Sequence, residues 1–379
     1  MTSVTRMHEQ LAHVAGLPEA QAQCLPGCFY TSADYFAWEA ENVLAKEWHC
    51  LGRADEVAKP GDYFTTRLLD EPLLVVRGDD GRIRVLSNVC RHRGMPLAEG
   101  SGSTRRFICS YHAWSYRRDG VLATAPRMAD KGVTSETCRL PEFRSEIWNG
   151  FIYVNLNQDA APLSPRLGKL ESLLANYEPE GMRIVHVAEE EWRTNWKCLV
   201  ENFMEAYHLS VVHPETLHPY TPTGLSRKSM SDDAFTSYCA NYPDDIPSRG
   251  AGGPGLSAEE RKRSTLFCLF PTQVASQAAT LLVSFSLQPV AVDRVRVRWT
   301  MSTWGDELTR DEVEQRIALW NEVNREDREK LERMQQALSS RHAPSGALAP
   351  KDYEGTIWDF YRYLGRQAPP PPLRIAASA

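Results

Sequence analysis

Two short segments of the chain each combine one cysteine with one histidine. Cys90-Arg-His92 is followed, after sixteen intervening residues, by Cys109-Ser-Tyr-His112. Two cysteines and two histidines hold either one tetrahedral zinc ion or a [2Fe–2S] cluster with mixed sulfur and nitrogen ligands. Zinc fingers usually pair cysteine with cysteine and histidine with histidine, whereas here each segment supplies one of each. The alternating order therefore favours the iron–sulfur cluster, in which each loop gives one ligand to each iron.

A second group of possible metal ligands lies further along the chain. A helix over Thr194–Leu209 would place Glu205 and His208 on one face. His213 fits that helix poorly, and Pro214 disfavours helical backbone at His213, so the helix should end or bulge there and turn the second imidazole back. Two neutral imidazoles and one carboxylate form the facial triad that leaves positions open on Fe(II) for oxygen and substrate.

The carboxylate of such a triad has to come from another part of the chain. A long helix is predicted from Glu307 to Leu338, and one apolar stripe runs along it. The stripe consists of Trp320, Asn324, Asp327, Leu331, Met334 and Leu338. Asp327 interrupts this stripe, and an unpaired buried carboxylate is costly, whereas Glu326 falls on the expected solvent face. We therefore predict Asp327 as the third ligand; its alternative role is an ion pair with a buried arginine.

The predicted secondary structure differs between three segments of the chain. Residues 1–45 are predicted to be a helical segment that packs on the catalytic domain. Residues 46–160 contain short β-rich runs separated by Gly, Asp and Pro, which indicates a small antiparallel β domain. Residues 161–379 combine helices with strands at Thr280–Gln288 and Arg294–Trp304. The predicted fold class is α+β, with an N-terminal β domain and a catalytic domain that has an antiparallel sheet and a long C-terminal helix.

Length and composition limit the classes of protein that fit. The chain has 379 residues, of which 42% are hydrophobic and 24% charged, so two packed domains are expected. The net charge of −6 argues against a nucleic-acid or anionic-membrane partner. No apolar run approaches the roughly 18 residues of a membrane-spanning helix. Nine cysteines in a chain of this length do not suggest a disulfide scaffold, so we expect a cytoplasmic protein.

Both groups of ligands resemble motifs of the Rieske non-haem iron oxygenases, and the resemblance covers nearly the whole chain. That family has CxHRG followed by CPYHGW, which stand here as CRHRG and CSYHAW, with Ser110 for proline and Ala113 for glycine. The second family motif reads roughly N-x2-D-x2-H-x4-H, and its acid and two histidines correspond here to Glu205, His208 and His213. The resemblance implies a [2Fe–2S] cluster on Cys90, His92, Cys109 and His112, and a mononuclear Fe(II) on His208, His213 and Asp327.

The resemblance also implies an assembly and a source of electrons. Subunits of this family form trimers, and electrons cross from the cluster of one subunit to the mononuclear iron of its neighbour. By motif position the bridging acid is Glu205, which would contact His208 of its own chain and His112 of the next. No Gly-rich dinucleotide fingerprint is present. The electrons of NAD(P)H should therefore arrive through a separate flavin- or ferredoxin-type reductase.

The substrate is a small molecule whose identity stays open between two classes. Most of the family has Asp at the position of Glu205, whereas the subgroups that act on carnitine and glycine betaine are similar to this chain in having Glu. That similarity favours hydroxylation or N-demethylation of a quaternary ammonium compound with O₂. The alternative is that Glu205 only fits the local backbone, in which case the reaction would be hydroxylation or O-demethylation of an aromatic acid. An electron carrier and a zinc-stabilised binding protein are the alternatives outside this enzyme class.

The substrate cavity is expected where aromatic residues fall in the second domain. These residues are Tyr220, Phe235, Tyr238, Phe267, Phe270 and Phe285. A cage of two or three such rings would bind a trimethylammonium group through cation–π contacts. The same rings would also stack on an aromatic substrate or form core.

Overall fold

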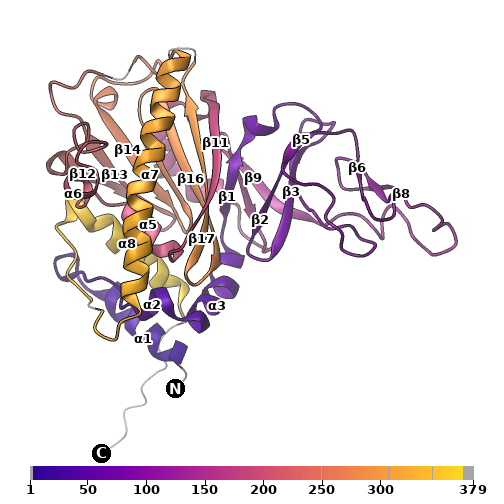
Figure 1. Cartoon of the computed structure of the whole chain (residues 1–379), viewed down its shortest axis with the longest axis horizontal. Coiled ribbons are helices and arrows are strands. Elements are labelled where there is room, and N and C mark those ends of the chain that lie inside the picture. Colours follow the sequence, from indigo (N-terminus) through magenta and orange to yellow (C-terminus); the bar gives the residue numbers. More distant parts are fainter. Residues whose placement is uncertain (1–2, 249, 306–307, 344, 370–379) are drawn as a thin grey trace, which may run out of the picture.

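The computed structural model describes residues 3–248, 250–305, 308–343 and 345–369. Figure 1 shows a larger α+β part beside a smaller β part, with the N-terminal helices beneath the larger one. The α-helices are α1 (Ser3–Gly16), α2 (Cys28–Thr31), α3 (Ala33–Asn42), α4 (Gly168–Leu174), α5 (Trp196–Phe203), α6 (Leu209–Val212), α7 (Arg310–Leu338) and α8 (Lys351–Gln367).

The smaller part is built on a seven-stranded antiparallel sheet in the order β1-β10-β9-β4-β3-β2-β5. Its strands are β1 (His49–Arg53), β2 (Asp62–Leu68), β3 (Glu71–Arg77), β4 (Ile83–Ser87), β5 (Ser101–Ser103), β9 (Glu142–Trp148) and β10 (Phe151–Asn155). Apolar residues of the central strands, such as Leu73 and Val85, are fully buried in one cluster. This sheet supports the loops that contain the first pair of motifs.

A three-stranded sheet lies at the outer end of the smaller part, away from α7 (Figure 1). Its strands are β6 (Phe107–Ile108), β7 (Ser115–Tyr116) and β8 (Leu122–Thr124). Cys90 and His92 lie in the loop between β4 and β5, and Cys109 and His112 lie in the loop between β6 and β7. The two motif loops therefore meet at the end of the molecule farthest from the long helix.

The larger part is built on a second seven-stranded antiparallel sheet in the order β11-β17-β16-β15-β14-β13-β12. Its strands are β11 (Arg183–Trp192), β12 (Ser226–Ser231), β13 (Phe235–Asn241), β14 (Arg263–Leu269), β15 (Gln273–Gln277), β16 (Leu281–Ala291) and β17 (Arg294–Thr303). The helix α7 crosses one face of this sheet (Figure 1), and α8 packs on β12 and β13. Strands β16 and β17 are where the sequence predicts them.

The N-terminal helices belong to the core of the larger part. Helix α1 contacts α8, and α2 contacts α7. Lys197 of α5 and Glu39 of α3 form an ion pair at 2.8 Å in which neither side chain is more than 1% exposed. The ammonium group also lies 5.1 to 5.8 Å from the ring centres of Trp196, Tyr30 and Tyr35. Hydrogen bonds and aromatic faces together compensate for the loss of water around this buried charge.

The helix predicted over Thr194–Leu209 is wrong as one continuous element. Helix α5 ends at Phe203 and α6 begins at Leu209. The backbone groups freed between them bind elsewhere: the carbonyl of Met204 accepts the hydroxyl of Thr356, and the amide of Ala206 donates to the carbonyl of Tyr353. These partners lie on α8, a helix that the sequence reading missed, so local periodicity could not reveal the break.

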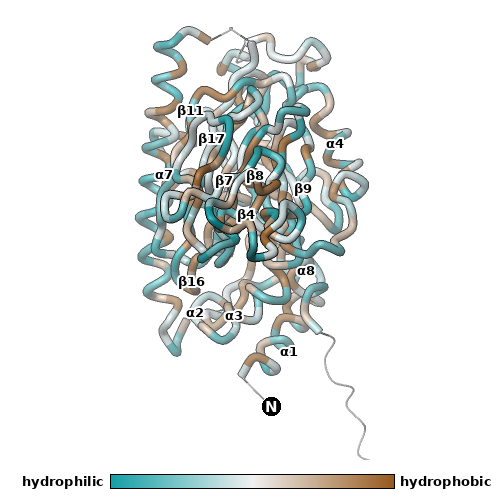
Figure 2. The backbone as a smooth tube through the Cα atoms, turned by 90° about the vertical axis from the view of Figure 1, so that its right-hand side faces the viewer, coloured by the Kyte–Doolittle hydropathy of each residue, from teal (hydrophilic) through white to brown (hydrophobic). Residues whose placement is uncertain are grey.

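Helix α7 agrees with its prediction except at two points. It begins at Arg310, where the hydroxyl of Thr309 caps the backbone amide of Glu312, while Glu307 lies outside the described residues. Met334 is 40% exposed and does not belong to the buried stripe. Figure 2 shows the alternation of polar and apolar residues along this helix. None of the helices within the described residues is both long and apolar enough to span a membrane.

Candidate metal centres

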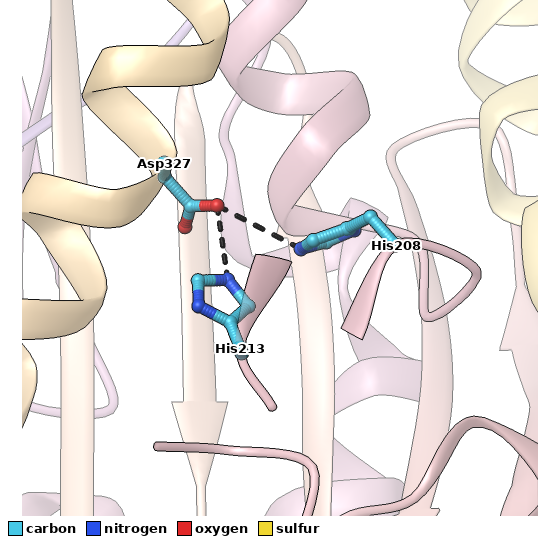
Figure 3. Close-up of side chains that lie close together, drawn as sticks. All are labelled: His208, His213 and Asp327. Carbon is cyan, nitrogen blue, oxygen red and sulfur yellow. Dashed lines mark hydrogen bonds and ion pairs between the residues drawn. The ribbon is translucent and has the colours of Figure 1, made fainter. Parts of the chain in front are cut away.

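Three predicted ligands from separate elements come together in the larger part. His208 precedes α6, His213 follows it, and Asp327 lies on α7; one ligand atom of each lies within 4.8 Å of the others. The Nε2 atoms of His213 and His208 lie 3.0 and 3.7 Å from Oδ1 of Asp327. Figure 3 shows both imidazoles directed at this one carboxylate. Two imidazoles and one carboxylate on one side of a point are the donor set of a non-haem Fe(II) site.

Each imidazole is oriented by a second carboxylate behind it. Nδ1 of His208 is hydrogen-bonded to Oε1 of Glu205, and Nδ1 of His213 lies 2.7 Å from Oε2 of Glu326. A carboxylate only accepts here, so each Nδ1 carries a proton, and each Nε2 lies on the side of Asp327. The residues present therefore fit a metal ion, because a cation between the three side chains would bind Nε2 of each ring while Nδ1 stays hydrogen-bonded to its carboxylate.

The electrostatics of the group favour positive charge between the three side chains. Burial lowers the pKa of the His208 imidazole, but the hydrogen bond and charge of Glu205 and the charge of Asp327 outweigh it, so the pKa lies above its ordinary value. Burial and the charge of Glu205 raise the pKa of Glu354 on α8. Several carboxylates thus surround two imidazoles. A divalent cation bound between them would reduce the repulsion between the negative charges.

Glu205 has a structural task in addition to its contact with His208. Its Oε2 accepts the backbone amides of Tyr207 and His208, the residues that lead into α6. Glu205 is 8% exposed, and its main-chain carbonyl lies 3.4 Å from the hydroxyl of Tyr238. One oxygen therefore fixes the turn that carries His208 while the other fixes its ring.

The solvent-face assignment of Glu326 is wrong. The side chain of Glu326 is 17% exposed, and its Oε2 accepts hydrogen bonds from Nδ1 of His213 and from the hydroxyl of Thr216, both at 2.7 Å. Helical periodicity places residue 326 beside the buried stripe, on a side of α7 that was expected to face solvent. The segment after α6 packs on this side and covers Glu326. No local sequence signal marks this contact, which depends on two segments more than a hundred residues apart.

The two motif loops of the smaller part have the same backbone geometry. The amide of Cys90 donates to the carbonyl of Met95, and the amide of Gly94 donates to that of Cys90; Cys109 repeats these bonds with residues 114 and 113. The rings of His92 and His112 lie 4.6 Å apart. Twin loops that present one cysteine and one histidine each fit a cluster with mixed ligands.

The donor atoms of these loops are arranged for a buried group. Nδ1 of His92 is buried without a hydrogen-bond partner among the described residues, as expected for a ligand atom. Burial raises the pKa of the Cys90 thiol, the hydroxyl of Tyr116 opposes that shift, and the neighbouring Cys109 thiol adds to it. The Tyr116 hydroxyl lies 3.4 Å from Sγ of Cys90 and accepts the amide of Arg91 at 3.0 Å.

Two aromatic residues that follow the second motif, Trp114 and Tyr116, contact predicted ligands of the cluster. Trp114 stacks on His92 with ring centres 4.9 Å apart. Tyr116 is in addition a donor, because a thiolate ligand only accepts hydrogen bonds. Hydrogen bonds to cluster sulfurs influence the reduction potential. The side chain that follows the second motif by four residues therefore belongs to the environment of the predicted cluster.

Ala113 occupies a backbone position that favours glycine. Its φ is +58°, and Gly94 at the equivalent place in the other loop has φ +77°. A left-handed conformation costs an L-residue roughly 1–2 kcal/mol. We expect Ala113→Gly to raise the free energy of unfolding by about 1 kcal/mol, measured as a shift in the urea midpoint under nitrogen. Ala129→Gly, at an exposed site without positive φ, should give no gain; a lower midpoint for Ala113→Gly would contradict the argument.

A small chamber of about 70 Å³ is lined by residues that lie close in the sequence to members of the first group of donors. Its described lining carries no charge and consists of Leu209, Leu217, Tyr220, Thr221, Tyr238, Ala240, Tyr242, Ser264, Leu266, Ser276, Ala278, Leu281, Leu319 and Trp320. Leu209 directly follows His208, and Trp320 precedes Asp327 by seven residues, which is about two turns of α7. The three donors are not among the described lining residues, and the chamber is bounded instead by residues that neighbour two of them along the chain.

The aromatic residues of the chamber differ in part from those expected. Tyr220 and Tyr238 line it as predicted. The other four, Phe235, Phe267, Phe270 and Phe285, are at most 2% exposed and belong to the core. Tyr242 and Trp320 line the chamber instead. Burial and cavity lining depend on strand register, which composition does not reveal.

Comparison with known proteins identifies both parts of the chain. The family described as "Ring hydroxylating alpha subunit (catalytic domain)" matches residues 179–369, and "Rieske [2Fe-2S] domain" matches residues 47–144. The Rieske match favours the iron–sulfur reading of the first motif pair over zinc. Together the two matched domains imply a Rieske cluster and a mononuclear iron.

Curated relatives match over part of their length. The carnitine monooxygenase oxygenase subunit of Escherichia coli (strain K12) is 35% identical over 198 residues, which is 51% of this chain and 53% of that protein. The glycine betaine monooxygenase oxygenase subunit of Chromohalobacter salexigens is 33% identical over 195 residues, 51% of this chain and 44% of that one. The chain thus spans about half the length of the curated relatives it matches.

Solved structures show the same fold over almost the whole chain. The quaternary ammonium Rieske monooxygenase CntA in complex with L-carnitine is 24% identical, with a TM-score of 0.80 and coverage of 93% of this chain and 99% of that one. Naphthalene 1,2-dioxygenase from Rhodococcus sp. is 17% identical, with a TM-score of 0.80 and coverage of 97% and 98%. The chain belongs to the ring-hydroxylating oxygenase alpha subunits, which combine a Rieske domain with a catalytic domain.

Proposed function

We propose that the chain is the oxygenase component of a Rieske non-haem iron monooxygenase acting on a small quaternary ammonium compound. The observation that carries this proposal is an uncharged chamber lined by four aromatic residues, in which the lining residue Leu209 directly follows His208 of the triad. A quaternary nitrogen donates no hydrogen bond and is bound by aromatic faces. The relatives named for carnitine and glycine betaine support this substrate class.

The proposal assigns the seven candidate ligands to two separate metal centres. Cys90, Cys109, His92 and His112 would hold the [2Fe–2S] cluster, and the triad would hold iron. Bound iron would supply the activation of O₂ at its open positions. Glu205 and Glu326 keep the imidazoles oriented, and the chamber would receive the N-methyl group between largely apolar walls.

The overall reaction balances with two electrons from outside the chain. One N-methyl group, O₂, two electrons and two protons give an N-hydroxymethyl group and water. Loss of formaldehyde from the hydroxymethyl group then completes demethylation. We propose that a separate NAD(P)H-dependent reductase supplies the electrons in the cytoplasm, a reducing compartment that suits the nine unpaired cysteines.

A ring of three identical chains is the assembly that suits two widely separated centres. In Figure 1 the sheet with β6 and β8 lies at the right end of the chain and α6 at the left. Apolar side chains are exposed near both centres: Met95, Ile108 and Tyr111 by the first, Tyr207 and Val211 by the second. Contact of one patch with the other in a neighbouring copy would bury both and bring His112 to Glu205.

The test is a single turnover of the chemically reduced, iron-loaded protein with O₂ and a panel of betaines and aromatic acids. Mass spectrometry should find formaldehyde and a demethylated or hydroxylated ammonium product. A hydroxylated or O-demethylated aromatic acid instead would overturn the substrate class and retain the oxygenase. Metal analysis should find about three irons per chain; about two would indicate an electron carrier.

A further inference from the structure

A second cavity, with a volume of about 360 Å³, lies at the C-terminal end of α7. It is lined by Tyr30 of α2, by Cys198 and Glu201 of α5, by Met334 and Leu338 of α7, and by the segments next to these helices. Figure 1 shows α2 beside the lower end of α7, where the two helices are in contact. None of the described residues that line this cavity lines the chamber. We call it the α2–α7 cavity.

Most of the wall of the α2–α7 cavity is apolar. Leu25, Met334 and Leu338 contribute hydrocarbon and thioether surface. The thiols of Cys24 and Cys198 stay neutral, because burial raises the pKa of both well above its ordinary value, and a neutral thiol behaves as a small apolar group. Met334 is 40% exposed because it lines this cavity instead of packing in the core. The wall therefore suits the apolar part of a small ligand, and the volume lies in the range of roughly 300–1,000 Å³ typical of such sites.

Glu201 places a carboxyl group in this apolar wall. No Lys, Arg or His accompanies it among the described lining residues. Its Oε1 accepts the hydroxyl of Tyr30 at 2.7 Å, and that hydroxyl lies 3.2 Å from the hydroxyl of Tyr361. Lys197, one turn earlier on α5, has the spacing of a helical ion pair with Glu201, but its ammonium group is bound by Glu39 at 2.8 Å. Glu201 thus borders the cavity without an ion-pair partner among the described residues.

We propose that the α2–α7 cavity binds a primary ammonium ion that carries an apolar chain, with the ammonium group paired to Glu201 and the chain against the apolar wall. A protonated primary amine donates the charge-assisted hydrogen bonds that a carboxylate accepts. A quaternary ammonium group donates none and is bound by aromatic faces. Tyr30 is the aromatic residue among the described lining residues, and the ammonium group of Lys197 already lies 5.7 Å from its ring centre. The ligand class therefore differs from the substrate class proposed for the chamber, and the two proposals are independent.

The carboxyl group has to lose its proton before it pairs with an ammonium ion. Burial raises the pKa of Glu201 to about 8. The titratable and charged groups around it are Cys24, Tyr30 of α2, Lys197 and Cys198 of α5, and Glu354 and Tyr361 of α8. A primary amine has a pKa near about 10.4 and stays protonated below pH 9. Affinity should therefore rise between pH 6 and pH 8, by up to about tenfold per pH unit, as Glu201 gives its proton to the solvent.

The experiment compares three probes of equal chain length on the full, metal-loaded protein. The probes are octylammonium, octyltrimethylammonium and 1-octanol, and binding is measured anaerobically by calorimetry at pH 6, 7 and 8. Glu201→Gln removes the charge and keeps an acceptor oxygen for Tyr30. Ala337→Leu fills part of the cavity and leaves Glu201 unchanged. Ala318→Leu is the matched control, because Ala318 is an exposed alanine of the same helix that does not line the cavity.

Octylammonium should bind the wild type more tightly than the other two probes. Glu201→Gln should weaken its binding at pH 8 by about 10- to 100-fold and abolish the pH dependence, with 1-octanol unaffected. Ala337→Leu should weaken binding of both octylammonium and 1-octanol, and Ala318→Leu should change neither.

Four results would overturn the site. These are no binding of octylammonium to the wild type, equal binding to the wild type and Glu201→Gln, an equal loss for 1-octanol in Glu201→Gln, and the same effect from both alanine variants. Melting temperature and cluster absorbance show whether each variant is folded. If Glu201→Gln does not fold, the pH profile of the wild type and the two alanine variants decide. None of these results depends on the substrate of the chamber, so the proposed function is tested separately by turnover.

Discussion

Replacement of Glu205 by alanine is expected to reduce turnover by about 100-fold or more while both metal centres still fill in excess iron. The variant removes the contact with Nδ1 of His208 and the acceptor that fixes the turn before it. Misplacement of a reacting group by about 1 Å costs on the order of 100-fold. After rapid mixing of the reduced protein with O₂ and substrate, the absorbance of the cluster should show that the cluster remains reduced.

Two comparisons separate a bridging role from loss of structure. Glu354→Gln changes a partly buried carboxyl group that senses the charge of Glu205, and it should leave cluster oxidation nearly unchanged. Co-production of Glu205→Ala chains with Cys109→Ser chains, which cannot hold the cluster, should restore part of the activity, because each defect lies in a different chain. Normal cluster oxidation in Glu205→Ala would refute the bridge assignment.

Replacement of Glu326 by alanine is expected to lower the affinity for mononuclear iron by about 10- to 100-fold. The variant leaves Nδ1 of His213 without its acceptor, so the ring loses both its fixed tautomer and its orientation. Glu326→Gln retains an acceptor oxygen and should lose less. Equilibrium dialysis followed by metal analysis, with the cluster content measured by its absorbance, reports the two centres separately.

A carboxylate on the neighbouring turn of the same helix provides the control. Glu329 is exposed and pairs with Arg325 and Arg333, and its replacement by alanine should leave the iron content unchanged. Thr216→Val removes the other hydrogen bond to Glu326 and should have an intermediate effect. Iron affinity of Glu326→Ala equal to that of the wild type would show that His213 needs no partner on Nδ1.

The sequence was informative where ligands follow one another at short spacing. The paired Cys and His residues and the two histidines around α6 carry a signal within a few residues, because such sites are made by tight loops and a proline. Asp327 was predicted from the apolar stripe of α7, because burial of one helix face produces a periodic pattern that is visible in the sequence of that helix alone.

Contacts between distant segments were the part that sequence reading missed. The break after Phe203 is stabilised by backbone partners on α8, and Glu326 meets His213 only because α7 passes the end of α6. The hydroxyl of Tyr116 lies near Cys90 because β7 places it there. Each of these features depends on how separate elements pack. The hydrophobic pattern of one helix or strand does not indicate which other elements lie next to it.

The buried pair of Lys197 and Glu39 has a consequence for how such proteins could be recombined. The segment recognised as a catalytic domain begins at residue 179, yet the carboxylate that neutralises Lys197 lies on α3, before the Rieske domain. Removal of one partner from a buried pair leaves an uncompensated charge. The segment recognised as homologous is therefore shorter than the segment that must fold together. A gene fusion with a different Rieske domain would have to include the first helices of this chain.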